Sequence, residues 1–175
     1  MKIGLYASMF GKGDNPLPTI ESFIDLAYAE RLDVIDLRSD VGFSDHDSSY
    51  LLDTKMSCLN KGLAIGYLAT TGHFVGTEDE LKTKLDTVRS DLDVAVKLGA
   101  PMVRVFCGET PEGEAVGTRE VECFQEACDE AAQRGIAVGL QNHPCTGDGV
   151  LRLFDAVNRS NFTFILDTGQ WVGSP

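Results

Sequence analysis

The sequence lacks the short motifs that identify several large classes of protein. It has no GxGxxG, because Gly11-Lys-Gly13 is followed by Asp-Asn-Pro, and it has no GxxxxGK[ST] loop. No apolar run approaches the roughly 20 residues that cross a bilayer, and no signal-peptide core follows Met1. These absences argue against dinucleotide-binding, P-loop and membrane-spanning proteins, and we expect a cytoplasmic protein.

Basic residues and paired cysteines are also scarce. The chain has 15 Lys and Arg against 27 Asp and Glu, which gives a net charge of -12. An acidic surface repels nucleic acid and anionic membranes, so we expect neither as a partner. Five cysteines, an odd number without a CxxC, argue against a disulfide framework and a zinc knuckle, and they indicate buried thiols.

What the sequence does contain is a regular alternation of strand and helix patterns. Strand-like apolar runs occupy 2–7, 33–38, 63–70, 101–108, 136–143 and 162–167. Helical patterns occupy 18–31, 49–61, 78–98, 118–134 and 147–158. The interval of roughly 30 residues is the length of one βαβ unit, and Gly62, Gly99 and Gly135 stop three helices just before the next strand. The pattern predicts an α/β fold with parallel strands, with residues 1–175 as a single domain.

Two of the helical patterns have a clear apolar stripe that we expect to face the sheet. The stripe residues are Ile20, Phe23, Ile24, Ala27 and Tyr28 in the first helix, and Leu81, Leu85, Val88, Leu92 and Val96 in the third.

Two architectures fit this alternation. An open, doubly wound sheet of six strands would be complete at this length, whereas a TIM barrel needs eight units and about 250 residues. The sixth strand closes at Asp167, and only eight residues follow it, too few for a covering helix. We therefore expect a TIM-type barrel represented by about six of its eight βα units and lacking the two C-terminal ones.

The polar residues of interest lie where strands end, which is where α/β folds bind ligands. In the strand 136–143, the two-residue period places Gly139, Gln141 and His143 on one face. Val138, Leu140 and Asn142 lie on the other face, so one face packs under helices while the second projects an amide and an imidazole into a site.

Each candidate site residue has a structural alternative. Gln141 is a ligand or substrate anchor, or a polar residue of the barrel interior with satisfied hydrogen bonds. Asp167 follows an apolar strand and needs a partner, for which a metal is natural, or it caps the next loop. His143 binds substrate, or it is a structural residue. His73 binds substrate, or it is a solvated loop residue. Trp171 stacks against a sugar, or it caps the barrel.

Arg104 lies inside the apolar run Met102-Val-Arg-Val-Phe106. A buried guanidinium is costly unless it is paired with an anion. Two alternatives follow: Arg104 binds a phosphate or carboxylate of the substrate, or it pairs with Asp36 or Glu109 in the chain.

The chain resembles the sugar phosphate isomerase/epimerase family, whose fold is the xylose isomerase-like TIM barrel. The resemblance is sharpest at Val103-Arg-Val-Phe106, Val138-Gly-Leu-Gln-Asn-His143 and Ile165-Leu-Asp-Thr-Gly169. It implies one divalent metal, Mn²⁺, Mg²⁺, Co²⁺ or Zn²⁺, with Asp167 as a ligand. Gln141 stands where the family usually has a Glu, and Gln170 where it often has a His. The family's other two ligands come from a seventh and an eighth strand.

The resemblance also implies an activity, namely metal-dependent isomerisation or epimerisation of a sugar, sugar phosphate or cyclitol through an enediolate. Asp167 and Gln141 would be the catalytic and metal-binding residues. A Gln carbonyl can ligate Mg²⁺ or Mn²⁺, but it cannot accept a proton at neutral pH and so cannot be the general base.

The alternative is a non-catalytic sugar-binding relative that has lost its base. An AP-endonuclease-like nuclease is disfavoured by the acidic charge. We expect these 175 residues alone to be inactive and to associate as a homo-oligomer, because six strands leave two sheet edges unpaired.

Overall fold

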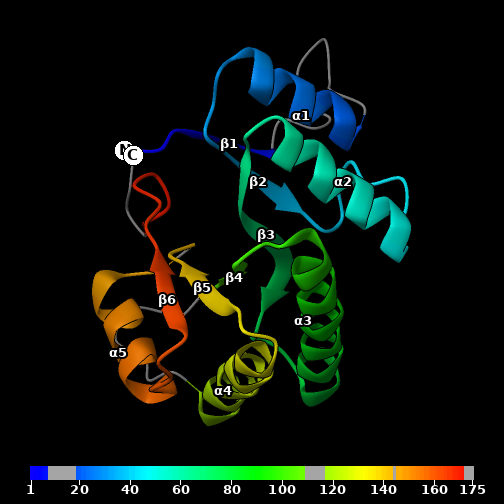
Figure 1. The fold of residues 1–175 in the computed structure, drawn as a ribbon. Helices are drawn as coiled ribbons and strands as arrows, with labels where there is room; N and C mark the ends of the chain where they lie inside the picture. Colours follow the sequence, from blue (N-terminus) through cyan, green and yellow to red (C-terminus); the bar gives the residue numbers. More distant parts are fainter. Residues whose placement is uncertain (8–18, 109–116, 144, 172–175) are drawn as a thin grey trace.

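The computed structural model describes residues 1–7, 19–108, 117–143 and 145–171, in which six parallel strands alternate with five helices (Figure 1). The strands are β1 (Gly4–Tyr6), β2 (Val34–Arg38), β3 (Ala64–His73), β4 (Met102–Phe106), β5 (Ala137–Gln141) and β6 (Phe162–Ile165). The helices are α1 (Ile20–Ala29), α2 (Ser48–Asn60), α3 (Glu78–Leu98), α4 (Thr118–Gln133) and α5 (Gly147–Val157).

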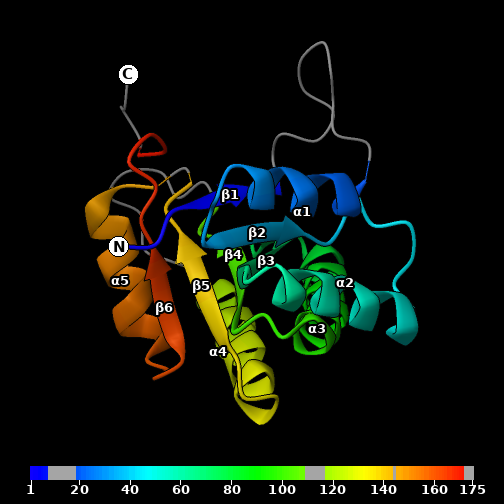
Figure 2. The same cartoon turned by 45° about the horizontal axis from the view of Figure 1, so that its top comes forward.

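The order of the strands decides between the two architectures. Each strand pairs in parallel with the next one in the chain, giving the order β1-β2-β3-β4-β5-β6. A doubly wound sheet reverses its order at a switch point, whereas a barrel keeps sequential order with its helices outside. The helices form an arc around the strands (Figure 1), which is also visible in the tilted view of Figure 2. The barrel-type α/β prediction is confirmed.

The apolar core lies between the sheet and this arc of helices. Alternate residues of three strands are fully buried on the helix side: Ile35, Leu37, Val103, Val105, Val138 and Leu140. The predicted stripes of α1 and α3 pack against them, with two exceptions. Tyr28 is 57% exposed and Val96 is 42% exposed. At 3.6 residues per turn the stripe of α3 passes through Ala95 instead, which is fully buried.

The helix ends follow the local sequence signals. The bounds of α3 are those predicted, because Thr77 and Glu80 form a capping box at its start. Gly99 ends α3 in the left-handed conformation, with φ of 77°, and Gly62 and Gly135 also have positive φ after their helices. One strand boundary is wrong in a way that affects the site: β5 ends at Gln141 instead of reaching His143.

All five cysteines are buried thiols, as the sequence predicts. Among the residues that the structure describes, no helix combines the length and the apolar character needed to pass through a bilayer.

We expect the 175-residue chain to self-associate through its sheet edges. In the described part of the chain, β1 and β6 each have a strand partner on one side only, and Phe164 and Leu166 on the β6 edge are 38% and 59% exposed. Light scattering after gel filtration should give a mass above 19.0 kDa, and Leu166→Lys should shift the chain towards the monomer. A monodisperse wild-type monomer would contradict this expectation.

Candidate active site

The face of the sheet away from the helices carries polar and aromatic side chains near the C-terminal strand ends. Because Val103 and Val105 face the helices, the alternation of side chains along β4 turns Arg104 towards the interior. The Cζ atom of Arg104 lies 4.1 Å from the ring centre of Phe106, 5.3 Å from that of Tyr6 and 6.0 Å from that of Tyr67. Side chains from β1, β3 and β4 therefore meet around one guanidinium.

A chain of hydrogen bonds joins three of the predicted site residues. Arg104 Nη1 donates to Gln141 Oε1 at 2.6 Å, and Gln141 Nε2 donates to Asp167 Oδ2 at 2.7 Å. A guanidinium can only donate and a carboxylate can only accept, so the Gln141 amide fits between them in one orientation. The middle of β4, the end of β5 and the segment after β6 are thus linked through side chains that the sequence predicts as site residues.

Asn142 fixes the backbone of Asp167, and sequence reasoning missed this role. Its Nδ2 donates to the carbonyl oxygen of Asp167 at 2.8 Å, its Oδ1 accepts from the amide nitrogen of Asp167 at 2.8 Å, and its side chain is fully buried. The sequence placed Asn142 on the helix-facing side with Val138 and Leu140. The two-residue period stops at Gln141, however, so it does not apply to Asn142. An amide directly after an apolar strand was the available signal.

Arg104 has no carboxylate partner among the described residues. It is 4% exposed, no salt bridge in the described part of the chain includes it, and its Nε is buried there without a hydrogen-bond acceptor. Burial lowers the pKa of Arg104, and the nearby Tyr6 and Tyr67 oppose this effect. The predicted ion pair with Asp36 is therefore absent, and Glu109 lies outside the described residues.

Asp36 faces the same interior from β2. Burial raises its pKa from 3.8 to about 6, although a backbone hydrogen bond at Tyr67 and the charge of Arg104 act in the opposite direction. A Cβ at position 66 would lie 2.3 Å from Asp36 Oδ1, so the close approach of this carboxylate to β3 requires Gly66. Asp36 is consequently a second desolvated ionisable group beside Arg104.

Of the other predicted site residues, His143 lies beside this chain of hydrogen bonds, whereas His73 and Trp171 make their contacts elsewhere. His143 is exposed, with its ring centre 5.3 Å from that of Phe106, so it borders the site. His73 contacts α3, where its Nε2 lies 3.2 Å from Lys84 Nζ. Trp171 lies on the helix side of β6, with its ring centre 6.2 Å from that of Phe164. The contacts of His73 and Trp171 are therefore directed away from Gln141.

The residues of this arrangement do not fit a divalent metal ion between Gln141 and Asp167. The Gln141 carbonyl, its metal-ligating atom, accepts from a positively charged guanidinium, and its NH₂ group faces Asp167. The second oxygen of Asp167 accepts from the Gly169 amide at 3.0 Å. Within the described ranges, no three His, Cys, Asp or Glu side chains form a group that could hold a metal. No chemical step is therefore assigned to a metal.

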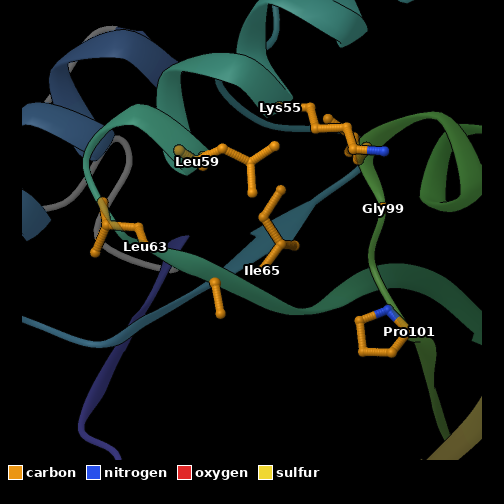
Figure 3. Close-up of a pocket in the computed structure, with 9 residues that line it drawn as sticks. Lys55, Leu59, Leu63, Ile65, Gly99 and Pro101 are labelled. Carbon is orange, nitrogen blue, oxygen red and sulfur yellow. The ribbon is translucent and has the colours of Figure 1, made fainter.

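A separate cavity of about 320 Å³ lies at the opposite ends of β3 and β4 (Figure 3). Its lining includes Leu59, Leu63, Ile65 and Pro101, with Lys55 as its charged residue. Because TIM barrels carry their active sites at the C-terminal strand ends, we do not assign this apolar cavity to the site.

A family model described as the xylose isomerase-like TIM barrel matches residues 30–174. The chain belongs to this family. None of the curated proteins matches it by sequence.

Several solved structures have the same fold. The IOLI protein with a bound zinc atom superposes with a TM-score of 0.79 at 16% identity, covering 97% of this chain and 64% of that one. The probable 3-DHS dehydratase AsbF from Bacillus anthracis superposes with a TM-score of 0.77 at 19% identity, covering 99% of this chain and 65% of that one. D-allulose 3-epimerase from Methylomonas sp. superposes with a TM-score of 0.74 at 22% identity, covering 97% of this chain and 64% of that one. A sugar epimerase thus has the same fold, and this chain spans slightly less than two-thirds of the length of these three proteins.

The raised pKa of Asp36 predicts a pH-dependent cost of folding. A carboxyl with a raised pKa in the folded state binds its proton more tightly there than in the unfolded chain. The folded protein therefore loses stability as the pH increases from the unfolded-state pKa of 3.8 through the folded-state pKa of about 6. The shift corresponds to about 3 kcal/mol at most, which partial exposure reduces to about 1–2 kcal/mol. In urea unfolding, the free energy of unfolding of Asp36→Asn relative to wild type should increase by this amount as the pH is raised from 4 to 7. A difference that does not change with pH would refute the prediction.

Loss of the Asn142 side chain should destabilise the fold. Asn142→Ala removes two 2.8 Å hydrogen bonds to the Asp167 backbone, and we expect a loss of about 1–3 kcal/mol in the free energy of unfolding. Asn60→Ala, at an exposed position at the end of α2, is the control and should change it by less than about 0.5 kcal/mol. Equal effects of the two substitutions would argue against this role for Asn142.

Proposed function

We propose that the chain forms the larger part of the site of an isomerase or epimerase that acts on a sugar, sugar phosphate or cyclitol. The reaction would be a proton transfer through an enediolate. The observation that supports this proposal is the Arg104–Gln141–Asp167 hydrogen-bond chain, which joins the middle of β4 to the C-terminal end of β5 and to the residues just after β6. It occurs in a xylose isomerase-like barrel whose fold is shared with D-allulose 3-epimerase, and this end of a barrel is where catalytic groups are placed.

Within this chain of hydrogen bonds, Asp167 is the group that can accept a proton. Gln141 cannot act as a base at neutral pH, and Arg104 remains protonated. The bonds that Gln141 and the Gly169 amide donate to the two oxygens of Asp167 hold its carboxylate in a fixed orientation. We assign proton transfer to Asp167, orientation to Gln141, and contact with substrate hydroxyl groups to the bordering His143. Substrate-binding roles for His73 and Trp171 stay sequence-based predictions.

A second candidate function is non-catalytic sugar binding. The Gln141 amide supports it, because the position at which the family usually carries a Glu holds a group without acid–base activity. In this case Asp167 would accept a hydrogen bond from a sugar hydroxyl and would exchange no proton.

Proton exchange distinguishes the two functions. The protein at its full native length would be incubated with a panel of ketoses, aldoses, their phosphates and inososes in D₂O, and deuterium incorporation at carbon would be followed by NMR. We expect Asp167→Asn to reduce exchange about 100-fold or more, because it removes the proton acceptor. Asp155→Asn, at an exposed position of α5, is the matched control and should leave exchange unchanged. Sugar binding by the wild type without any exchange would contradict the isomerase and favour the binding protein.

A further inference from the structure

We propose that Arg104 is the anchor for an oxyanion, a carboxylate or a phosphate group, carried by the ligand of this site. This proposal rests on the proposed function only in taking the rest of the ligand to be a sugar. The oxyanion itself is inferred from the surroundings of the guanidinium.

The pairing of the arginines sets Arg104 apart. Five others form salt bridges with carboxylates and have side chains that are 27–42% exposed: Arg38, Arg89, Arg119, Arg134 and Arg159. Arg104 is 4% exposed, and in the described part of the chain no carboxylate pairs with it. A buried cation without an anion is costly, whereas an exposed one is compensated by water. Arg104 is thus buried without a carboxylate at ion-pair distance in the described residues, and a bound oxyanion would supply the counter-charge.

One edge of the guanidinium carries a buried donor, Nε, that has no acceptor in the described residues. The bond to Gln141 is made by Nη1. Nε and Nη2 form the edge that a carboxylate or phosphate can engage with two parallel hydrogen bonds. The ring of Phe106, with its centre 4.1 Å from Cζ, lies close enough for a cation–π contact that holds the guanidinium plane.

The amide at position 141 contributes to this preference for an anion. A glutamate there would place a carboxylate where the Oε1 atom now lies, 2.6 Å from Nη1, and would neutralise the guanidinium within the protein. Gln141 fixes the orientation of Arg104 without cancelling its charge. The nearest carboxylate along the hydrogen-bond chain, Asp167, is separated from Arg104 by that amide. Neither Gln141 nor Asp167 therefore neutralises Arg104 by a direct contact.

The first test uses the wild-type chain and needs no substitution in the site. The ¹⁵N-labelled intact protein would be titrated with inorganic phosphate while the Nε–H resonance of Arg104 is followed, with Arg104→Lys used only to assign that resonance. We expect a saturable shift of the Arg104 signal and none for Arg38, whose guanidinium already binds Asp40. An unchanged Arg104 signal would overturn the proposal.

The second test measures ligand class by calorimetry with glucose 6-phosphate, glucuronate and neutral glucose. At least one anionic sugar should bind more tightly than glucose. The anionic sugar with the higher affinity then shows whether Arg104 prefers a phosphate or a carboxylate. Arg104→Lys should weaken anionic binding about tenfold or more, because an ammonium cannot form the paired hydrogen bonds. Arg38→Lys is the matched control and should change it less than about twofold, because its guanidinium is already paired.

Equal effects of the two substitutions, or glucose binding as tightly as both anionic sugars, would overturn the proposal while leaving the proposed isomerase intact. A phosphate-dependent shift of Arg104 together with no sugar binding would support the oxyanion anchor and reject the proposed function. The two failures are therefore distinguishable.

Discussion

The amide of Gln141, bonded between a cation and an anion, is the interaction on which the rest of the site depends. It fits only if the ends of β4, β5 and β6 are in register, as the pairing of Phe106 with Gln141 and of Gln141 with Ile165 provides. Asn142, the next residue, binds the backbone of Asp167 and so fixes the far end of the same contact. One strand end thus sets the position of a guanidinium on one side and of a carboxylate on the other.

The chemical type of residue 141 decides what else the site requires. Two neighbouring carboxylates repel each other and need a cation or a proton between them. An amide removes that requirement, because its NH₂ group donates to Asp167 directly. Hydrogen bonds therefore join Arg104 to Gln141 and Gln141 to Asp167, whereas a glutamate in the middle would need a cation on its Asp167 side. The substitution changes the electrostatics of the site more than its shape, since the two side chains have nearly the same size.

The sequence was sufficient for the elements, because strand and helix periodicities, Gly62, Gly99, Gly135 and the Thr77 cap act locally. These local signals fitted both an open sheet and a barrel, and the resemblance to the family favoured the barrel. The sequence also identified Arg104, Gln141 and Asp167 as polar residues in or after apolar strands. It could not show that they bond to one another, because that depends on the register of three strands that are distant in sequence. The role of Asn142 was missed for a local reason, namely that β5 ends at Gln141 and the alternation of side chains ends with it.

On the interior face, the charge of an oxyanion bound to Arg104 would be linked to proton binding by Asp36. Asp36 and Arg104 are both desolvated, and the charge of Arg104 is one of the factors that keep the pKa of Asp36 from rising above about 6. An oxyanion bound to Arg104 would offset that charge and make ionisation of Asp36 less favourable. By thermodynamic linkage, protonation of Asp36 would in turn favour the anion. An oxyanion on Arg104 would therefore affect both groups, on β2 and β4, although no hydrogen bond between their side chains is seen in the described residues.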